Sequence, residues 1–410
     1  MEFEGMLKRF LEFVKIDTQS DESSDSFPST KKQLNLSNRL VDELKTIGLK
    51  DAFVNKWGYV FATLESNVNK KLPTIALISH VDTAPDVSGK DVKPKINKNY
   101  DGGDIILSDK DNVILKAEDN PYLSTKKGKT IITTSGDTLL GADDKAGIVE
   151  ILGALEYLIS HPDIARPRIR VLFTPDEEIG NGVNHVTKKE IDADYAYTVD
   201  GEKLGEIEDE TFCADSAEII ITGINVHPGY AKGKLLNAVK IASDLINEFP
   251  KDALSPETTE KREGYIHPYS ITGFAEQTTL KILLRDFEES GLRKQEKYLR
   301  TVVDKMSKKH PKASIKLNVT ESYRNMKVIL DEYPKVTELA IKAVENSGIK
   351  PERNIIRGGT DGARLSFMEL PTPNIFTGGS NFHSKFEWIA LEDMYKASEV
   401  LVNLMKLWAE

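Results

Sequence analysis

The chain has 410 residues, of which 39% are hydrophobic and 29% are charged, as expected for a globular protein of two or three domains. Its net charge of −10 argues against a broad phosphate-binding face, and its single cysteine, Cys213, excludes an intrachain disulfide or a Cys-rich zinc module. No run approaches about 18 apolar residues, and the N-terminal stretch lacks a secretory-signal pattern. We therefore expect no membrane span and a cytoplasmic location.

Apolar strand patterns alternate with helical patterns in the first and last parts of the chain. Strands are predicted at 74–79, 169–174 and 195–199, and helices at 4–15, 30–47, about 145–159, 334–347 and 391–409. The helix near 145–159 is the clearest, because Ile148, Ile151, Leu152 and Leu155 form one apolar stripe. Strands that alternate with helices predict an α/β fold with a mostly parallel sheet flanked by helices.

The middle of the chain has a different pattern. Strands are predicted at 216–222, 278–285 and 313–320, and helices at 234–248 and 287–309. We interpret 211–322 as a domain inserted between the two parts, 1–210 and 323–410, of a larger domain. Residues 293–312 contain eight Lys and Arg against two acidic residues. We interpret them as a solvated helix face, because no aromatic platform for nucleic-acid bases accompanies them.

Two histidines lie where metal ligands would be expected. His80 and Asp82 follow the 74–79 strand and share one face, so Asp82 could fix the tautomer of a metal-binding His80. His383 lies in a late glycine-rich segment. Taken alone, each histidine is more simply interpreted as a hydrogen-bonded residue near a turn or loop.

Acidic residues follow three further predicted strand ends or turns. Asp143 and Asp144 open the helix near 145, where an aspartate is first of all a helix N-cap. Glu177 and Glu178 follow the 169–174 strand, and Asp200 closes the 195–199 strand. A solvated acidic run and an Asp-Gly turn are the alternative readings.

Together, these histidines and acidic residues indicate a site more strongly than any of them alone, because open sheets bind their ligands at the carboxyl ends of the strands. Imidazole and carboxylate donors without thiolate suit Zn, Mn or Co. Two divalent ions, a bridging hydroxide and the carboxylates of Asp143, Glu178 and Asp200 would form a neutral core. Glu177 would then be free to act as a base.

The motifs also carry a family resemblance. SHVDTAPD, LLGADDKAG, TPDEEIGNG, VDG and FHSKFEW resemble the two-zinc metallopeptidases related to carboxypeptidase G, the aminoacylases and succinyl-diaminopimelate desuccinylase. VHPGYAKGKLLNA, LLRDFE and RGGTDGARLS resemble the tripeptide aminopeptidase branch of that family. The resemblance therefore runs nearly from end to end.

The resemblance implies a set of metal ligands. Asp143 would bridge two ions, most simply zinc, with cobalt or manganese as alternatives. His80 and Asp200 would complete one ligand shell, and Glu178 and His383 the other. Asp82 would orient His80, and Glu177 would be the general base for a water that the ions activate. The implied fold is a dizinc exopeptidase α/β domain with an inserted ferredoxin-like lid.

The implied activity is hydrolysis of the first peptide bond of tripeptides. In the lid, His227 could stabilise the oxyanion, within the chain or across a homodimer formed through the lid. Arg285 and Arg357 could bind the substrate carboxylate. No nucleic-acid or membrane partner is expected, and one RGG sequence at 357–359 in an acidic chain does not change that.

Two other functions stay open from the sequence. A dipeptidase or an N-acyl-amino-acid deacylase would share the ligands and differ in the lid and the carboxylate site. A non-catalytic binding protein is disfavoured, because it would need neither the full ligand set nor Glu177.

Overall fold

The structure is a computed structural model that describes residues 5–410. It divides into two compact units. The first unit runs up to Asp209 and includes Met326–Asn354 and Thr360–Glu410, and the second comprises Glu210–Asn325 and Ile355–Gly359. Residue 4, the expected start of the first helix, lies outside the described residues.

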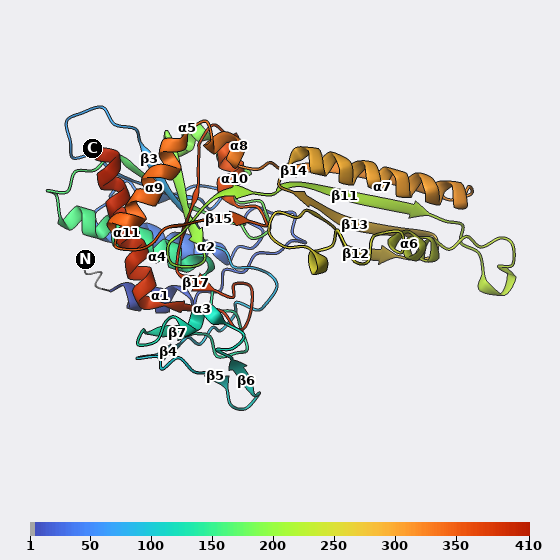
Figure 1. Cartoon of the computed structure of the whole chain (residues 1–410), viewed down its shortest axis with the longest axis horizontal. Helices are drawn as coiled ribbons and strands as arrows, with labels where there is room; N and C mark the ends of the chain where they lie inside the picture. Colours follow the sequence, from blue (N-terminus) through green and yellow to red (C-terminus); the bar gives the residue numbers. More distant parts are fainter. Residues whose placement is uncertain (1–4) are drawn as a thin grey trace. The chain divides into compact units, whose positions relative to one another are not determined.

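The first unit is built on an eight-stranded sheet with the order β1-β2-β8-β3-β9-β16-β10-β15 (Figure 1). Its strands are β1 (Phe53–Val54), β2 (Val60–Leu64), β3 (Ile75–His80), β8 (Ile169–Thr174), β9 (Tyr195–Gly201), β10 (Glu206–Thr211), β15 (Glu352–Ile356) and β16 (Asn374–Phe376). The four central strands β8, β3, β9 and β16 are parallel, whereas β2 and β10 join them antiparallel. The α/β class is confirmed, and the antiparallel flanks are an addition to the prediction.

Strand β3 is buried along its whole length, because its side chains alternate between two apolar layers. Ile75 and Leu77 belong to the larger core, which α1, α4 and α11 also build. Ala76 and Ile78 belong to the core on the other face, which Val183 and other side chains from outside the sheet complete. A strand covered on both faces gives a continuous apolar run in the sequence, so it was predictable.

Helices flank this sheet, and α11 lies beside both α4 and α9 (Figure 1). The helices of the first unit are α1 (Met6–Phe13), α2 (Gln33–Thr46), α3 (Pro121–Ser124), α4 (Ala142–Ser160), α5 (Lys188–Ile191), α8 (Lys327–Leu330), α9 (Pro334–Asn346), α10 (Asp361–Phe367) and α11 (Leu391–Ala409). None of the helices within residues 5–410 is both long enough and apolar enough to cross a bilayer.

Helix α4 packs unusually close to β9. A Cβ atom added to Gly147 would lie 1.9 Å from the Val199 carbonyl oxygen, so only glycine allows this approach. The two residues before Lys145, Asp143 and Asp144, have non-helical backbone angles although they fall within the bounds of α4. The close packing holds the start of α4 against the carboxyl end of the sheet.

Two small sheets complete the first unit. One has the order β17-β18-β7-β4, and the other pairs β5 with β6. Their strands are β4 (Lys95–Asn97), β5 (Ile105–Ser108), β6 (Val113–Leu115), β7 (Ile131–Thr133), β17 (Gly379–Ser380) and β18 (Trp388–Ala390). The β17-β18 hairpin contains the loop that carries His383.

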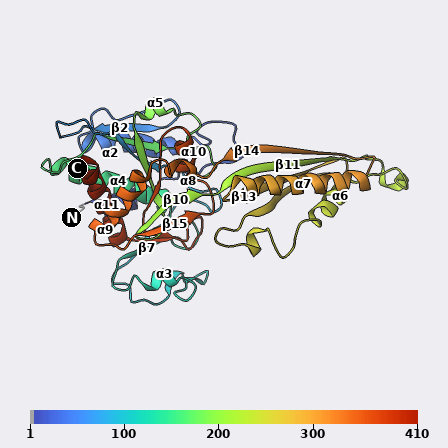
Figure 2. The same cartoon turned by 45° about the horizontal axis from the view of Figure 1, so that its top comes forward.

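The second unit has the chain order β-α-β-β-α-β of a ferredoxin-like fold (Figure 2). Its elements are β11 (Cys213–Thr222), α6 (Ala238–Ile246), β12 (Tyr265–Gly273), β13 (Gln277–Asp286), α7 (Glu289–Lys309) and β14 (Ser314–Tyr323). The four strands form an antiparallel sheet with the order β12-β13-β11-β14. Both helices contact the sheet and each other over one apolar core.

Candidate metal centre

Strand register brings the predicted ligand segments to one end of the large sheet. Ile78 of β3 pairs with Thr198 of β9, so His80 and Asp200 each lie two residues beyond the same rung. His80 pairs with Thr174, the last residue of β8, and the acidic pair follows that strand directly. Parallel strands in register therefore place an imidazole and several carboxylates at the same edge.

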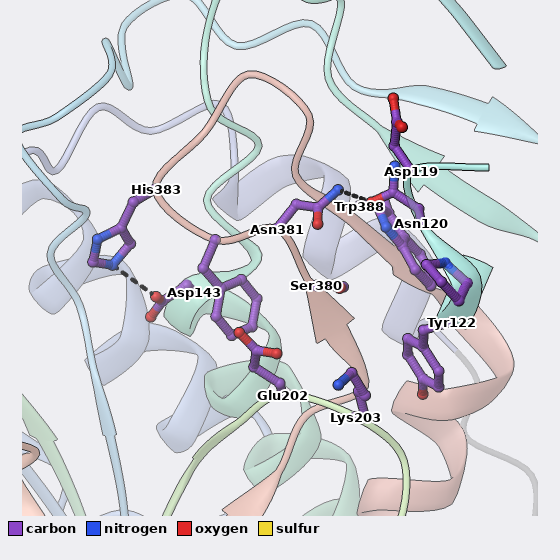
Figure 3. Close-up of a pocket in the computed structure, with 12 residues that line it drawn as sticks. Asp119, Asn120, Tyr122, Asp143, Glu202, Lys203, Ser380, Asn381, His383 and Trp388 are labelled. Atoms are coloured by element: carbon purple, nitrogen blue, oxygen red, sulfur yellow. Dashed lines mark hydrogen bonds and ion pairs between the residues drawn. The ribbon is translucent and has the colours of Figure 1, made fainter. Parts of the chain in front are cut away.

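Two groups of side chains could each hold a metal ion, and they share Asp143. His80 Nε2 lies 2.9 Å from Asp143 Oδ1 and 3.4 Å from Asp200 Oδ1. His383 Nε2 lies 3.2 Å from Asp143 Oδ2 (Figure 3). It also lies 2.8 Å from Glu178 Oε2. Asp143 thus presents one carboxylate oxygen to each group.

The chemistry of these donors fits divalent cations. Glu178 Oε1 is buried without a hydrogen-bond partner among the described residues. Burial, together with the charge of Asp143, raises the pKa of Asp200 to about 6 and that of Glu178 to about 8. Cations between these groups would offset this crowding of buried negative charge, and carboxylate with imidazole is a donor set that Zn, Mn and Co accept.

The same carboxylates raise the pKa of both histidines. Burial by itself would lower the pKa of His383, but hydrogen bonds with Asp143 and Glu178 outweigh it and raise the pKa to about 12. The pKa of His80 is likewise raised, because Asp200 and Asp143 outweigh the effect of burial. Both imidazoles therefore sit where a positive charge is strongly favoured.

Asp82 joins two of the ligand segments. Its Oδ1 lies 3.4 Å from His80 Nδ1. Its carboxylate accepts hydrogen bonds from the backbone N–H of Glu177 at 3.0 Å and of Glu178 at 3.1 Å. One buried carboxylate thus orients the His80 ring and fixes the turn that carries both glutamates.

Glu177 differs from its neighbours in having no bound partner. Among the described residues, its carboxylate forms no hydrogen bond or ion pair. Burial raises its pKa well above the usual glutamate range, and the charges of Asp200 and Asp361 add to that rise. A carboxylate in this environment has a strong tendency to accept a proton.

Of the two aspartates that the sequence offered as a helix cap, Asp144 takes the capping position. Its Oδ1 accepts a hydrogen bond from the Gly147 N–H at 3.2 Å, and its Oδ2 accepts one from the His80 N–H at 3.2 Å. The Ser79 hydroxyl also donates to Asp144 Oδ2. Capping by Asp144 leaves the Asp143 carboxylate free for the two histidines.

Glu387 is a residue that sequence reasoning missed. It is 1% exposed, and its Oε2 accepts hydrogen bonds from the backbone N–H of Leu140 at 2.7 Å and Gly141 at 2.9 Å. Its Oε1 accepts one from the Asp143 N–H at 3.1 Å. An acid between two aromatic residues, Phe386 and Trp388, four residues after His383, was the available signal.

The other predicted site residues lie in the second unit. His227 is exposed, and its Nδ1 accepts a hydrogen bond from the Gly229 N–H at 3.1 Å. Arg285 donates through Nη1 to the backbone oxygens of Asp215 and Leu284.

Arg357, also in the second unit, is held more tightly than Arg285. It donates through Nη1 to the backbone oxygens of Lys261 at 2.6 Å and Glu263 at 2.9 Å, and through Nη2 to Thr259 Oγ1 at 3.0 Å. Its guanidinium also lies over the Phe212 ring. These contacts give Arg357 a clear role in holding the 259–263 segment.

An α/β unit in which two metal-binding groups share a carboxylate is typical of metal-dependent hydrolases. The chain belongs to the family described as peptidase family M20/M25/M40, which residues 113–407 match. Peptidase T of Bacillus subtilis (strain 168) is 49% identical over 403 residues, which are 98% of this chain and 98% of that protein. The family expected from the motifs is thereby confirmed.

Two solved structures share the fold. A tripeptidase from Staphylococcus aureus subsp. aureus Mu50 has a TM-score of 0.77 at 20% identity, over 100% of this chain and 99% of that one. The Bacillus subtilis YXEP protein, a dinuclear metal-binding peptidase from the M20 family, has a TM-score of 0.62 at 14% identity, over 98% and 97% of the two chains. The similarity covers both units of the chain.

Proposed function

We propose that the protein is a metal-dependent aminopeptidase that hydrolyses the N-terminal peptide bond of tripeptides and releases an amino acid and a dipeptide. The observation that carries the proposal is the position of Asp143, one oxygen facing His80 and the other facing His383. The 49% identity to a peptidase T over nearly the whole chain supports the substrate class.

In this proposal, two divalent cations, zinc being the simplest choice, are held by five side chains. His80 and Asp200 would hold one cation, Glu178 and His383 would hold the other, and Asp143 would be shared by both groups. When bound, the cations would polarise the scissile carbonyl and lower the pKa of a water molecule. Asp82 acts through His80, whose ring it orients, and through the turn that carries Glu177.

Glu177 is proposed as the general base and acid. Its carboxylate has no competing partner in the described part of the chain, and burial favours its protonated form, so it can take a proton from water. The same group can return that proton to the amine of the departing dipeptide. This role requires Glu177 to reach the scissile bond without binding the cations, which its lack of partners allows.

The second unit is proposed to complete the site as a lid. His227 is exposed on a turn and would stabilise the developing oxyanion, from this chain or from a second copy. For the substrate carboxylate we favour Arg285, because Arg357 already donates through both terminal nitrogens within its own unit. We further propose the cytoplasm as the compartment, since a single buried cysteine, Cys213, leaves no disulfide to maintain.

A substrate panel with metal analysis tests the proposal. We expect free-amine tripeptides to be cleaved after the first residue, dipeptides and tetrapeptides to be poor substrates, and N-acetylated tripeptides to be refused. Chelation should abolish the activity, and re-addition of Zn, Co or Mn should restore it, with two ions bound per chain. Equal cleavage of N-acyl amino acids would instead identify a deacylase, and cleavage of dipeptides alone a dipeptidase.

A further inference from the structure

A pocket of about 680 Å³ in the first unit opens directly onto the metal-binding groups (Figure 3). Asp143 and His383 form one wall, and Tyr122, Phe382 and Trp388 contribute aromatic surface. The roles proposed for the metal-binding side chains, Glu177 and the second unit do not involve this pocket. An enzyme that removes one residue from a peptide needs room for a single side chain on that side of the scissile bond.

The walls of this pocket are fixed by hydrogen bonds. Asn381 Nδ2 donates to Asn120 Oδ1 at 2.7 Å and to the Phe386 carbonyl oxygen at 3.2 Å, which ties the His383 loop to the segment before α3. The Tyr122 hydroxyl donates to Asp393 and accepts a hydrogen bond from the Leu204 N–H at 2.8 Å. The pocket therefore does not depend on an induced rearrangement of these residues.

One carboxylate in the pocket lacks a partner near the centre. Glu202 follows Asp200 by two residues, and it lines the same pocket as Asp143 and His383 (Figure 3). Among the described residues its carboxylate forms no hydrogen bond or ion pair.

The cation next in the chain, Lys203, forms its ion pair with another residue. Lys203 Nζ lies 4.0 Å from Glu206 Oε1 and 5.9 Å from the centre of the Tyr122 ring. The ion pair of Lys203 is therefore with Glu206 and not with Glu202. An exposed carboxylate is left in the pocket that Asp143 and His383 line, where it would complement an ammonium group.

We propose that this pocket binds the N-terminal residue of the substrate and that Glu202 accepts the substrate's α-ammonium group; this inference rests on the proposed aminopeptidase function. The α-nitrogen is only two bonds, about 2.5 Å, from the scissile carbonyl carbon, so its acceptor must lie beside the metal-binding groups. Asp119, the other acid of the pocket without an ion pair or side-chain hydrogen bond within residues 5–410, lies on the wall away from Asp143 (Figure 3).

The test compares two substrates in three proteins. The substrates are a tripeptide and its analogue that lacks only the α-amino group. The proteins are the wild type, Glu202→Gln and Glu118→Gln, all loaded with metal. Glu118 is a matched control, because it is an exposed glutamate 3.4 Å from Lys116 and does not line the pocket.

In the wild type, kcat/KM should be much higher for the tripeptide than for the des-amino analogue. Glu202→Gln should reduce that ratio by roughly 10- to 100-fold, the range for a hydrogen bond between charged groups, with unchanged metal content and unfolding midpoint. Glu118→Gln should leave the ratio unchanged.

The outcomes separate the two proposals. An unchanged ratio in Glu202→Gln, with tripeptides still cleaved by the wild type, overturns the role of Glu202 and leaves the aminopeptidase function standing. A wild type that cleaves no free-amine tripeptide overturns both. A ratio that falls equally in both variants assigns the effect to overall charge and also overturns the specific role.

Discussion

Replacing Glu387 tests whether the metal-binding side chains depend on the hydrogen bonds behind them. The carboxylate accepts hydrogen bonds from three backbone N–H groups, at 2.7, 2.9 and 3.1 Å, in the segment that ends at Asp143. Glu387→Ala leaves all three donors without their acceptor. Each unsatisfied buried donor costs about 1–3 kcal/mol, which gives about 3–9 kcal/mol before any water enters the space.

Glu387→Gln is the more informative change, because it keeps the shape and one acceptor oxygen. If the amide oxygen takes the place of Oε2, only the bond from Asp143 is lost, and the cost is about 1–3 kcal/mol. The displaced Asp143 should also weaken metal binding by roughly 10- to 100-fold, as for other residues that orient metal ligands. The loss of stability and the weaker metal binding are both expected from the hydrogen bonds that Glu387 accepts.

Urea unfolding in the presence of chelator would measure the stability, and competition with a chromophoric chelator would measure metal affinity. Glu392→Gln is the matched control, since both Glu392 oxygens accept hydrogen bonds from the Thr130 N–H, at 2.9 and 3.1 Å, away from the metal-binding groups. It should lower stability without changing metal affinity. A Glu387→Gln protein that binds metal as tightly as the wild type would refute the reasoning.

Three further predictions concern catalysis, pH and packing. Glu177→Gln should lower kcat by roughly 10²–10⁴-fold while the protein still binds its metal; normal turnover would remove Glu177 as the base. Burial raises the pKa of Glu208, which accepts a hydrogen bond from Asn374, to about 8. The folded state therefore holds a proton that the unfolded state releases, so the apo protein should lose stability as pH rises from about 4.5 to 8, by at most about 5 kcal/mol. Urea unfolding of Glu208→Gln at pH 5 to 8.5 should show a shallower loss, and an equal slope would contradict the assignment. Gly147→Ala would force a methyl group against the Val199 carbonyl, 1.9 Å away, and should lower stability by about 1–3 kcal/mol; an unchanged urea midpoint would argue against that contact.

The parts of the fold that sequence could predict are those with one dominant periodicity. β3 and β8 are buried on both faces and have mostly apolar sequences, with Arg170 as an interruption in β8, and α4 has an apolar stripe. The positions of His80 and Asp200 followed from the ends of such strands. Their pairing needed the register of β3 with β9, which no local pattern contains.

Other strands could not be predicted, because they contain residue types that are unusual in buried or hydrogen-bonded strands. β10 has the polar sequence EIEDET, yet all six residues are buried, since Asn374, Arg353 and Arg262 supply partners for its acids. β12 contains Pro268, which the sheet tolerates because β12 is an edge strand. Long-range partners of this kind cannot be read from one segment.

The long-range contacts that support the centre could not be predicted for the same reason. Glu387 was missed altogether, and Asp144 was expected only as a helix cap, whereas both accept hydrogen bonds from the backbone of distant segments. Glu202 could not be distinguished from any surface acid until the pocket beside Asp143 was visible.

The carboxylates of Asp82, Asp144 and Glu387 have a consequence for how quickly ions leave. Each fastens one ligand-bearing segment to another, so no segment can swing outward by itself. Escape of an ion then requires several loops to open in concert, which is a rare fluctuation. The centre should accordingly exchange its ions slowly, and its exchange rate should match that of the backbone amides at Leu140 and Gly141.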